Sequence, residues 1–199
     1  MDIERVTQPA QEPQPDVRCL ESRVVYENPW MTLTEDVVER RDGSQGLYGV
    51  VRSRDFSLVL PWDGERFHLV EQYRYPVGAR LWEFPQGSVA DPPGLSAQEA
   101  AAVELAEEAG LVAATWQHLG FLHAGYGRSG NGFDVFLATE LTQVPERREP
   151  EEQDMRSGTF TREEVWDLVA RGLMTDSHSL AALALLHRWD QTSDPADVP

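Results

Sequence analysis

The chain has 199 residues, with 17 basic and 34 acidic side chains and a formal net charge of −17. This length favours one compact domain with a small appendage, and so acidic a surface excludes general binding to nucleic acid or to anionic membranes. No stretch approaches the roughly 18 apolar residues of a membrane-spanning helix, and a single cysteine, Cys19, excludes an intrachain disulfide, so we expect a cytoplasmic protein.

The first half of the chain predicts β-strands. Met31–Glu39 alternates apolar and polar side chains, as a half-buried strand does. Asp63 and Gly64 separate two apolar runs, at 56–60 and 67–73. Because an Asp-Gly pair is a typical hairpin turn, we expect these two runs to pair with each other.

The character of the sequence changes near residue 95. Ser96 and Glu99 have the spacing of a capping box, and Gly110 is a typical helix stop, so a helix is expected from Ser96 to Ala109. Further strands are expected at 115–123, 132–138 and 155–160, and further helices at 161–171 and 178–189. Strands on both sides of a helix indicate an α/β or α+β sandwich.

The expected helix carries three glutamates, Glu104, Glu107 and Glu108, within one sector about 100° wide. Like charges at this spacing repel one another, and carboxylates are disfavoured in the last turns of a helix. A bound Mg²⁺ or Mn²⁺ would explain the arrangement, because these ions prefer oxygen ligands. The alternative is a solvated acidic face. Another sector of the helix is apolar and is expected to face the core; it contains Leu105, Ala102, Ala106 and Ala109.

The sequence around this helix resembles the Nudix box, whose pattern is G-x5-E-x7-R-E-U-x-E-E-x-G-U with U apolar. The matching residues are Gly87, Glu104, Leu105, Glu107, Glu108, Gly110 and Leu111. The chain departs from the pattern in three ways. The segment after Gly87 is two residues longer, the arginine is Val103, and the first glutamate is Leu95. We expect Leu95 to pack on Val103 in place of the usual charged pair.

The resemblance extends to the branch of ADP-ribose and nucleoside-diphosphate-sugar pyrophosphatases, through residues 71–78, 82–87, 151–155 and 176–183. It implies a Nudix α/β/α sandwich with a mixed β-sheet and an N-terminal β-rich extension, commonly as a homodimer. The organisation that follows is a flexible arm at 1–16, a dimerising extension at 17–62, a Nudix domain at 63–190 and a flexible tail at 191–199.

The same resemblance implies the roles of individual residues. Metal ions would be held by Glu104, Glu107, Glu108 and the backbone carbonyl of Gln86. The general base would be Glu151 or Glu152 in the acidic stretch that also contains Glu149, or alternatively Glu107. Substrate contacts would come from Arg74, Glu83, Tyr126 and Arg128, with Arg74 on a phosphate.

The function implied is metal-dependent hydrolysis of ADP-ribose or a related nucleotide sugar to a nucleoside monophosphate and a sugar phosphate. One alternative is another nucleoside diphosphate derivative, such as GDP-mannose or a dinucleotide. Another is a Nudix-fold binding or regulatory protein without turnover, although three intact glutamates argue against it.

Overall fold

The computed structural model describes residues 16–88, 94–145 and 154–192. The chain divides into an N-terminal unit, residues 1–53 with 127–129, and a C-terminal unit, residues 54–126 with 130–199. None of the helices in these described ranges is long and apolar enough to cross a membrane.

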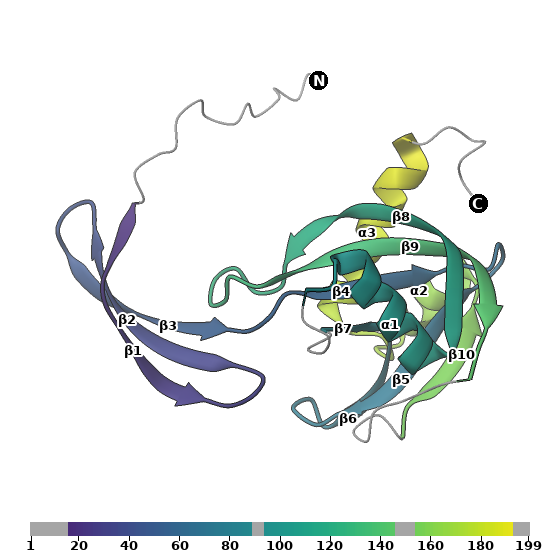
Figure 1. Cartoon of the computed structure of the whole chain (residues 1–199), viewed down its shortest axis with the longest axis horizontal. Helices are drawn as coiled ribbons and strands as arrows, with labels where there is room; N and C mark the ends of the chain where they lie inside the picture. The colour runs from purple at the N-terminus through teal and green to yellow at the C-terminus, as the bar shows by residue number, and fades with distance from the viewer. Residues whose placement is uncertain (1–15, 89–93, 146–153, 193–199) are drawn as a thin grey trace. The chain divides into compact units, whose positions relative to one another are not determined.

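The N-terminal unit contains a three-stranded antiparallel sheet in the order β1-β2-β3. Its strands are β1 (Val17–Glu27), β2 (Thr32–Arg40) and β3 (Gln45–Arg52) (Figure 1). The central strand buries alternate side chains, Thr34, Asp36 and Val38, which confirms the strand predicted from the alternation at 31–39.

The C-terminal unit contains two sheets, in the orders β10-β5-β6 and β7-β4-β9-β8. Their strands are β4 (Phe56–Pro61), β5 (Phe67–Arg74), β6 (Ala79–Glu83), β7 (Gln86–Gly87), β8 (Leu111–His123), β9 (Gly132–Gln143) and β10 (Arg156–Phe160). The pairing of β4 with β9 is parallel, so the second sheet is mixed. The three predicted helices are confirmed as α1 (Ala97–Ala109), α2 (Arg162–Ala170) and α3 (Ser177–Thr192).

Strand β4 shows why this unit is layered. Leu58 and Leu60 belong to a core that contains residues of α2 and α3, whereas Val59 belongs to a second core beneath α1. Successive side chains of a strand point to opposite faces, so a continuous apolar run serves both cores. The result is the expected α/β/α sandwich, with α1 on one side of the strands and α2 and α3 on the other (Figure 1).

The predicted hairpin around Asp63 is wrong. The turn forms, with the Asp63 carboxylate accepting the N–H groups of Glu65 and Arg66 at 2.9 and 2.7 Å, but only one bridge, between Trp62 and Phe67, joins the flanking strands. Strand β4 already pairs with β7 on one edge and β9 on the other, so β5 joins a different sheet.

Candidate active site

Helix α1 begins and ends where its sequence predicts. The Ser96 hydroxyl accepts the N–H of Glu99 at 3.3 Å, and the Glu99 carboxylate accepts the N–H of Ser96 at 2.8 Å. At the other end Gly110 has a left-handed backbone, with φ of 63°, and its N–H donates to the carbonyl of Leu105. Because both ends are fixed, the rotational position of every side chain on α1 is fixed too.

The buried face of α1 includes two of the three glutamates. Glu108 is 2% exposed and Glu104 is 8% exposed, whereas Glu107 is half-buried. Carboxylates are rarely buried without a partner that offsets the lost hydration. A general solvated acidic face therefore does not describe Glu104 and Glu108.

The apolar contacts of α1 differ in part from the prediction. Ala101, Leu105 and Ala109 are buried against the sheet, whereas Ala102 and Ala106 are only half-buried. The helix is thus turned so that its apolar stripe runs through Ala101, and this rotation brings the neighbouring glutamates inward.

The two buried carboxylates converge on the short strand β7. Glu108 Oε2 accepts the backbone N–H of Gln86 at 3.0 Å. The Glu104 carboxylate lies so close to Gly87 that a Cβ built there would be 2.5 Å from its Oε1. Only glycine leaves room for this carboxylate, which gives a physical reason for Gly87.

The backbone of Gln86 faces the same carboxylates. Val59 donates its N–H to the Pro85 carbonyl at 2.9 Å, so Pro85 faces strand β4 and Gln86 faces the opposite, free edge of β7. In a strand, the N–H and C=O of one residue project to the same side. The Gln86 carbonyl therefore opens toward the edge at which its N–H meets Glu108.

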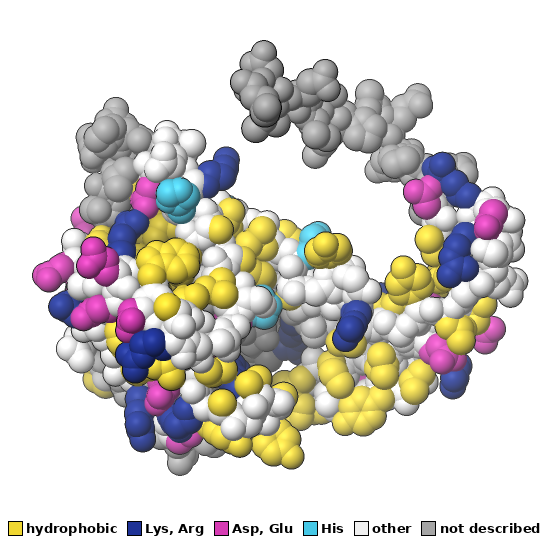
Figure 2. Space-filling view, turned by 180° about the vertical axis from the view of Figure 1, so that it is seen from behind, with side chains coloured by type: hydrophobic (Ala, Val, Ile, Leu, Met, Phe, Trp, Pro, Cys, Tyr) yellow, Lys and Arg dark blue, Asp and Glu magenta, His cyan; other side chains and the backbone are white. Residues whose placement is uncertain are grey.

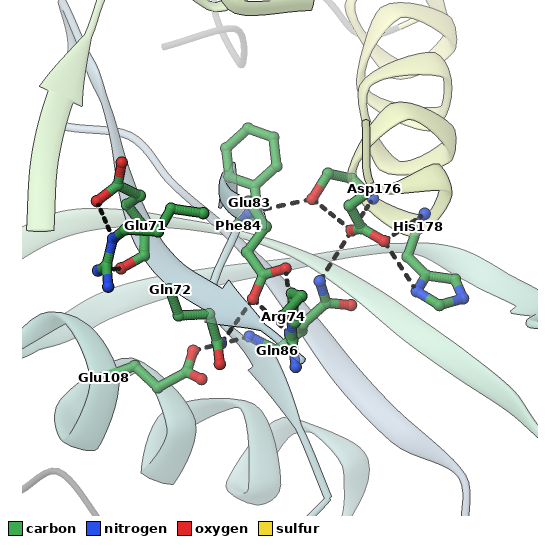
Figure 3. Close-up of polar contacts among 11 residues, drawn as sticks. Glu71, Gln72, Arg74, Glu83, Phe84, Gln86, Glu108, Asp176 and His178 are labelled. Carbon is green, nitrogen blue, oxygen red and sulfur yellow. Dashed lines mark hydrogen bonds and ion pairs between the residues drawn. The ribbon is translucent and has the colours of Figure 1, made fainter. Parts of the chain in front are cut away.

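Arg74 and Glu83, which the sequence suggested separately as substrate contacts, form one ion pair between β5 and β6 (Figure 3). Both oxygens of Glu83 accept from the Arg74 guanidinium, and Gln72 Nε2 donates to Glu83 Oε1 at 2.7 Å. The Glu83 side chain is 3% exposed and that of Arg74 is 40% exposed. The buried Glu83 thus orients Arg74 from the protein interior, while part of the guanidinium remains accessible to solvent.

The structure adds Asp176, which the sequence did not single out as a site residue. It directly precedes α3, and its Oδ2 accepts from the Ser179 N–H, the Ser179 hydroxyl and Gln86 Nε2, each at 2.8 Å (Figure 3). An Asp just before a helix is a typical N-cap, and that signal alone was present in the sequence. The contact with Gln86 spans 90 residues of sequence and is not visible from local pattern.

The site holds more negative than positive charge. Burial raises the pKa of Glu83, although Arg74 opposes this effect. Burial also works against the charge of Arg74, but Glu83, Glu108 and Asp176 outweigh it and raise the pKa of the guanidinium above its ordinary value. For Asp176, hydrogen bonds from His178, Gln86 and Ser179 overcome the effect of burial and hold the pKa well below its ordinary value.

The other predicted site residues belong to the segment between β8 and β9 or lie outside the described residues. Tyr126 is exposed in the segment between β8 and β9, and the carbonyl of Arg128 accepts the N–H of Val51 at 2.8 Å within the N-terminal unit. The candidate bases Glu151 and Glu152, with Glu149, lie outside the described residues.

The packing of Leu95 on Val103 stays a prediction. Both side chains are half-buried.

The oxygen atoms around β7 are suitable ligands for a hard divalent cation, because Mg²⁺ and Mn²⁺ prefer carboxylate and carbonyl oxygens. Within residues 16–88, 94–145 and 154–192, no group of three or more His, Cys, Asp or Glu side chains is arranged as a metal site by itself. Of the three glutamates predicted as ligands, Glu104 and Glu108 are the ones whose carboxylates lie against β7.

Known proteins resemble the chain over both units. Residues 17–51 match the family model of the nucleoside diphosphate sugar hydrolase N-terminal domain, and residues 52–183 match that of the NUDIX domain. The chain is 39% identical over 178 residues to an ADP-ribose pyrophosphatase of Mycobacterium tuberculosis, covering 86% of this chain and 84% of that protein. Its fold is similar to a crystal structure of an ADP compounds hydrolase, with a TM-score of 0.80 and 20% identity over 91% of this chain and 97% of that chain.

Proposed function

The chain belongs to the Nudix family and is a pyrophosphohydrolase of that family, and on this premise we propose that it hydrolyses ADP-ribose or a related nucleoside diphosphate sugar. The products are a nucleoside monophosphate and a sugar phosphate. The observation that carries the proposal is the convergence of buried Glu104 and Glu108 on Gln86 and Gly87, in a chain similar along most of its length to an ADP-ribose pyrophosphatase.

Glu104, Glu107, Glu108 and the Gln86 carbonyl would hold Mg²⁺ or Mn²⁺; Glu104 and Glu108 are buried, and Glu107 on the same helix is half-buried. A bound divalent cation offsets the charge of a diphosphate and lowers the pKa of a bound water. This resolves the conflict between an acidic protein and an anionic substrate, because the acidic residues attract the cation that the substrate needs.

Arg74 is the proposed phosphate contact. Glu83 holds the Arg74 guanidinium in place, and part of the guanidinium stays exposed. The other N–H groups can therefore bind a phosphate without the entropy cost of first ordering a flexible side chain. The role of Glu83 is then to orient Arg74, and not to contact the substrate directly. Tyr126 and Arg128 are proposed as further substrate contacts, and the proton acceptor is Glu107, Glu151 or Glu152.

We further infer a cytoplasmic homodimer that forms through the N-terminal unit. That unit exposes large apolar side chains on its outer strands β1 and β3 and between β1 and β2, among them Val24, Tyr26, Met31 and Leu47. Figure 2 shows hydrophobic side chains of this kind among charged ones at the surface. Apolar surface in such quantity is typical of an interface between proteins.

The test is hydrolysis of a panel of ADP-ribose, GDP-mannose and a dinucleotide with Mg²⁺ or Mn²⁺, measured as released monophosphate. We expect ADP-ribose to be the best substrate and Glu108→Gln to lower kcat/KM by about a hundredfold or more, since the variant loses a metal ligand. Glu65→Gln is the matched control, because the same change at an exposed turn residue leaves turnover unaltered.

Two results would count against the proposal. Absence of hydrolysis for the whole panel would rule out the substrate class. Turnover that does not depend on metal or on Glu108 would rule out the assignment of the metal site.

A further inference from the structure

Asp176 links the start of α3 to the segment that carries the proposed carbonyl ligand. Its Oδ2 accepts from Gln86 Nε2 at 2.8 Å, and its Oδ1 lies 3.2 Å from His178 Nδ1. A second connection runs through Ser179, whose hydroxyl donates to Asp176 and accepts the backbone N–H of Phe84 at 3.0 Å. The start of helix α3 is therefore hydrogen-bonded to the chain both just before β7 and within it (Figure 3).

Helix capping accounts for only part of these contacts. An N-cap side chain has to satisfy N–H groups of its own helix, as Asp176 does with Ser179. Thr161 caps α2 in the same way, because its hydroxyl accepts the backbone N–H of Glu164, the third residue of that helix. The bond from Asp176 to Gln86 adds nothing to capping, since Gln86 lies in a different element 90 residues away.

Gln86 is consequently held at both of its donor groups. Its backbone N–H donates to Glu108 on α1, and its side-chain amide donates to Asp176 at α3. The first anchor fixes the peptide plane before the Gln86 Cα and the second fixes the side chain that leaves it, and together they restrict the orientation of Cα and so the direction in which its carbonyl projects. The carbonyl opens toward the edge of β7 at which Glu108 accepts the N–H of Gln86, and the Glu104 carboxylate lies beside the next residue, Gly87.

We propose that Asp176 is a positioning residue that, through the side chain of Gln86, presets the Gln86 carbonyl for a divalent cation bound with Glu104 and Glu108. The inference rests on the proposed function, because it takes this edge of β7 as the metal site. Residues that orient the ligands of a metal, without touching the metal, commonly change its affinity by ten- to a hundredfold when they are replaced.

The experiment measures Mn²⁺ affinity of the full chain without substrate, from the electron paramagnetic resonance signal of free Mn²⁺. Asp176→Asn leaves one side-chain oxygen where the carboxylate had two, so the Gln86 amide, the Ser179 groups and the His178 N–H must compete for a single, uncharged acceptor, which weakens the bond to Gln86. Gln86→Met removes the bond from the other side and leaves the backbone in place. We expect each variant to weaken Mn²⁺ binding by about tenfold.

A double variant and a capping control separate positioning from general stability. If both residues act through one bond, Asp176→Asn with Gln86→Met binds Mn²⁺ no more weakly than the weaker single variant. Thr161→Ala, which removes the cap of α2, is expected to lower the thermal midpoint and leave Mn²⁺ affinity unchanged.

The outcomes are distinguishable. Wild-type Mn²⁺ affinity in Asp176→Asn, or losses that multiply in the double variant, would overturn the inference while leaving the proposed function intact. If Asp176→Asn does not fold, Gln86→Met alone decides, and unchanged affinity there overturns the inference. A wild-type chain that neither binds Mn²⁺ nor hydrolyses ADP-ribose would overturn both.

Discussion

Glu83 shows how one buried carboxylate organises its neighbours. Its two oxygens accept hydrogen bonds from Arg74 and Gln72, so its charge holds two side chains of the adjacent strand β5 in place. Glu83→Gln keeps the shape but leaves Arg74 without its partner, and we expect a loss of about 2 kcal/mol in the free energy of unfolding, which urea titration would measure. Because 40% of the Arg74 side chain is exposed to solvent, we expect the loss to be at the lower end of values for buried pairs.

The same variant tests the role of Arg74 in binding. A guanidinium that is no longer fixed binds phosphate less well, so KM for ADP-ribose is expected to rise more than kcat falls. A drop in kcat with unchanged KM would instead argue for a role of Glu83 in the chemical step.

Gly87 offers a second test at a single position. A methyl group there would meet the Glu104 carboxylate at about 2.5 Å, so Gly87→Ala has to displace that carboxylate. We expect kcat/KM to fall by about tenfold to a hundredfold, because small displacements of catalytic groups are costly. Gly49→Ala is the matched control, since Gly49 also lies in a strand and has no atom within 4 Å of an added Cβ. Equal activity of the two variants would contradict the placement of Glu104.

At the scale of elements, the capping boxes of α1 and α2 tie helix stability to pH. Hydrogen bonds with Thr161, and secondly the charge of Arg66 at 3.2 Å, lower the pKa of Glu164 below its ordinary 4.5. A carboxylate with a lowered native pKa adds stability above pH 4.5 and loses it as the pH falls through the native value. We therefore expect Glu164→Gln to lower the urea midpoint at pH 7 and to match the wild type more closely at pH 3.

Glu163→Gln serves as the control for this pH dependence. Glu163 lies in the same first turn of α2 but outside the capping box. A pH-dependent change of equal size in Glu163→Gln would mean that general first-turn charge, and not the box, is responsible.

The elements that local sequence pattern predicts are those with strong local signals. Alternation defines β2, and α1 and α2 start at capping boxes, so each follows from residues within a few positions. The two-residue strand β7 has no such signal, because it exists only through its pairing with Ser57 and Leu58. The hairpin at Asp63 failed for a related reason: the turn is local, but the choice of partner strands is not.

In the candidate site, too, local sequence pattern predicts some features, while others depend on contacts between distant elements. The spacing of Glu104 and Glu108 indicated a shared helix face, whereas their burial depends on the rotation that brings Ala101 into the core. The ion pair of Arg74 with Glu83 and the bond of Asp176 to Gln86 join separate elements, and no local pattern predicts them.

For the whole molecule, the exposed apolar surface of the N-terminal unit leads to a prediction about mass. We expect the protein in solution to have twice the 22.4 kDa of one chain, measured by light scattering during size-exclusion chromatography. Val24→Arg with Leu47→Arg is expected to halve that mass, because both side chains are more than half exposed in the single chain and arginine opposes their burial.

The control for this prediction is Trp166→Arg, which changes a comparably exposed apolar residue of the C-terminal unit. It should leave the mass at twice that of one chain. A wild-type mass of 22.4 kDa would contradict the dimer directly.

The fixed ends of α1 have a consequence for how chains of this kind can change length. Within α1 an inserted residue would turn everything beyond it by about 100°, so an insertion between Ser96 and Glu104 would carry the glutamates off β7, and one after Glu108 would displace the Gly110 cap. Before Ser96 no such constraint applies, and there the chain carries two residues more than the Nudix pattern. Evolutionary insertions and deletions should therefore collect upstream of Ser96, while the span to Gly110 keeps a constant length.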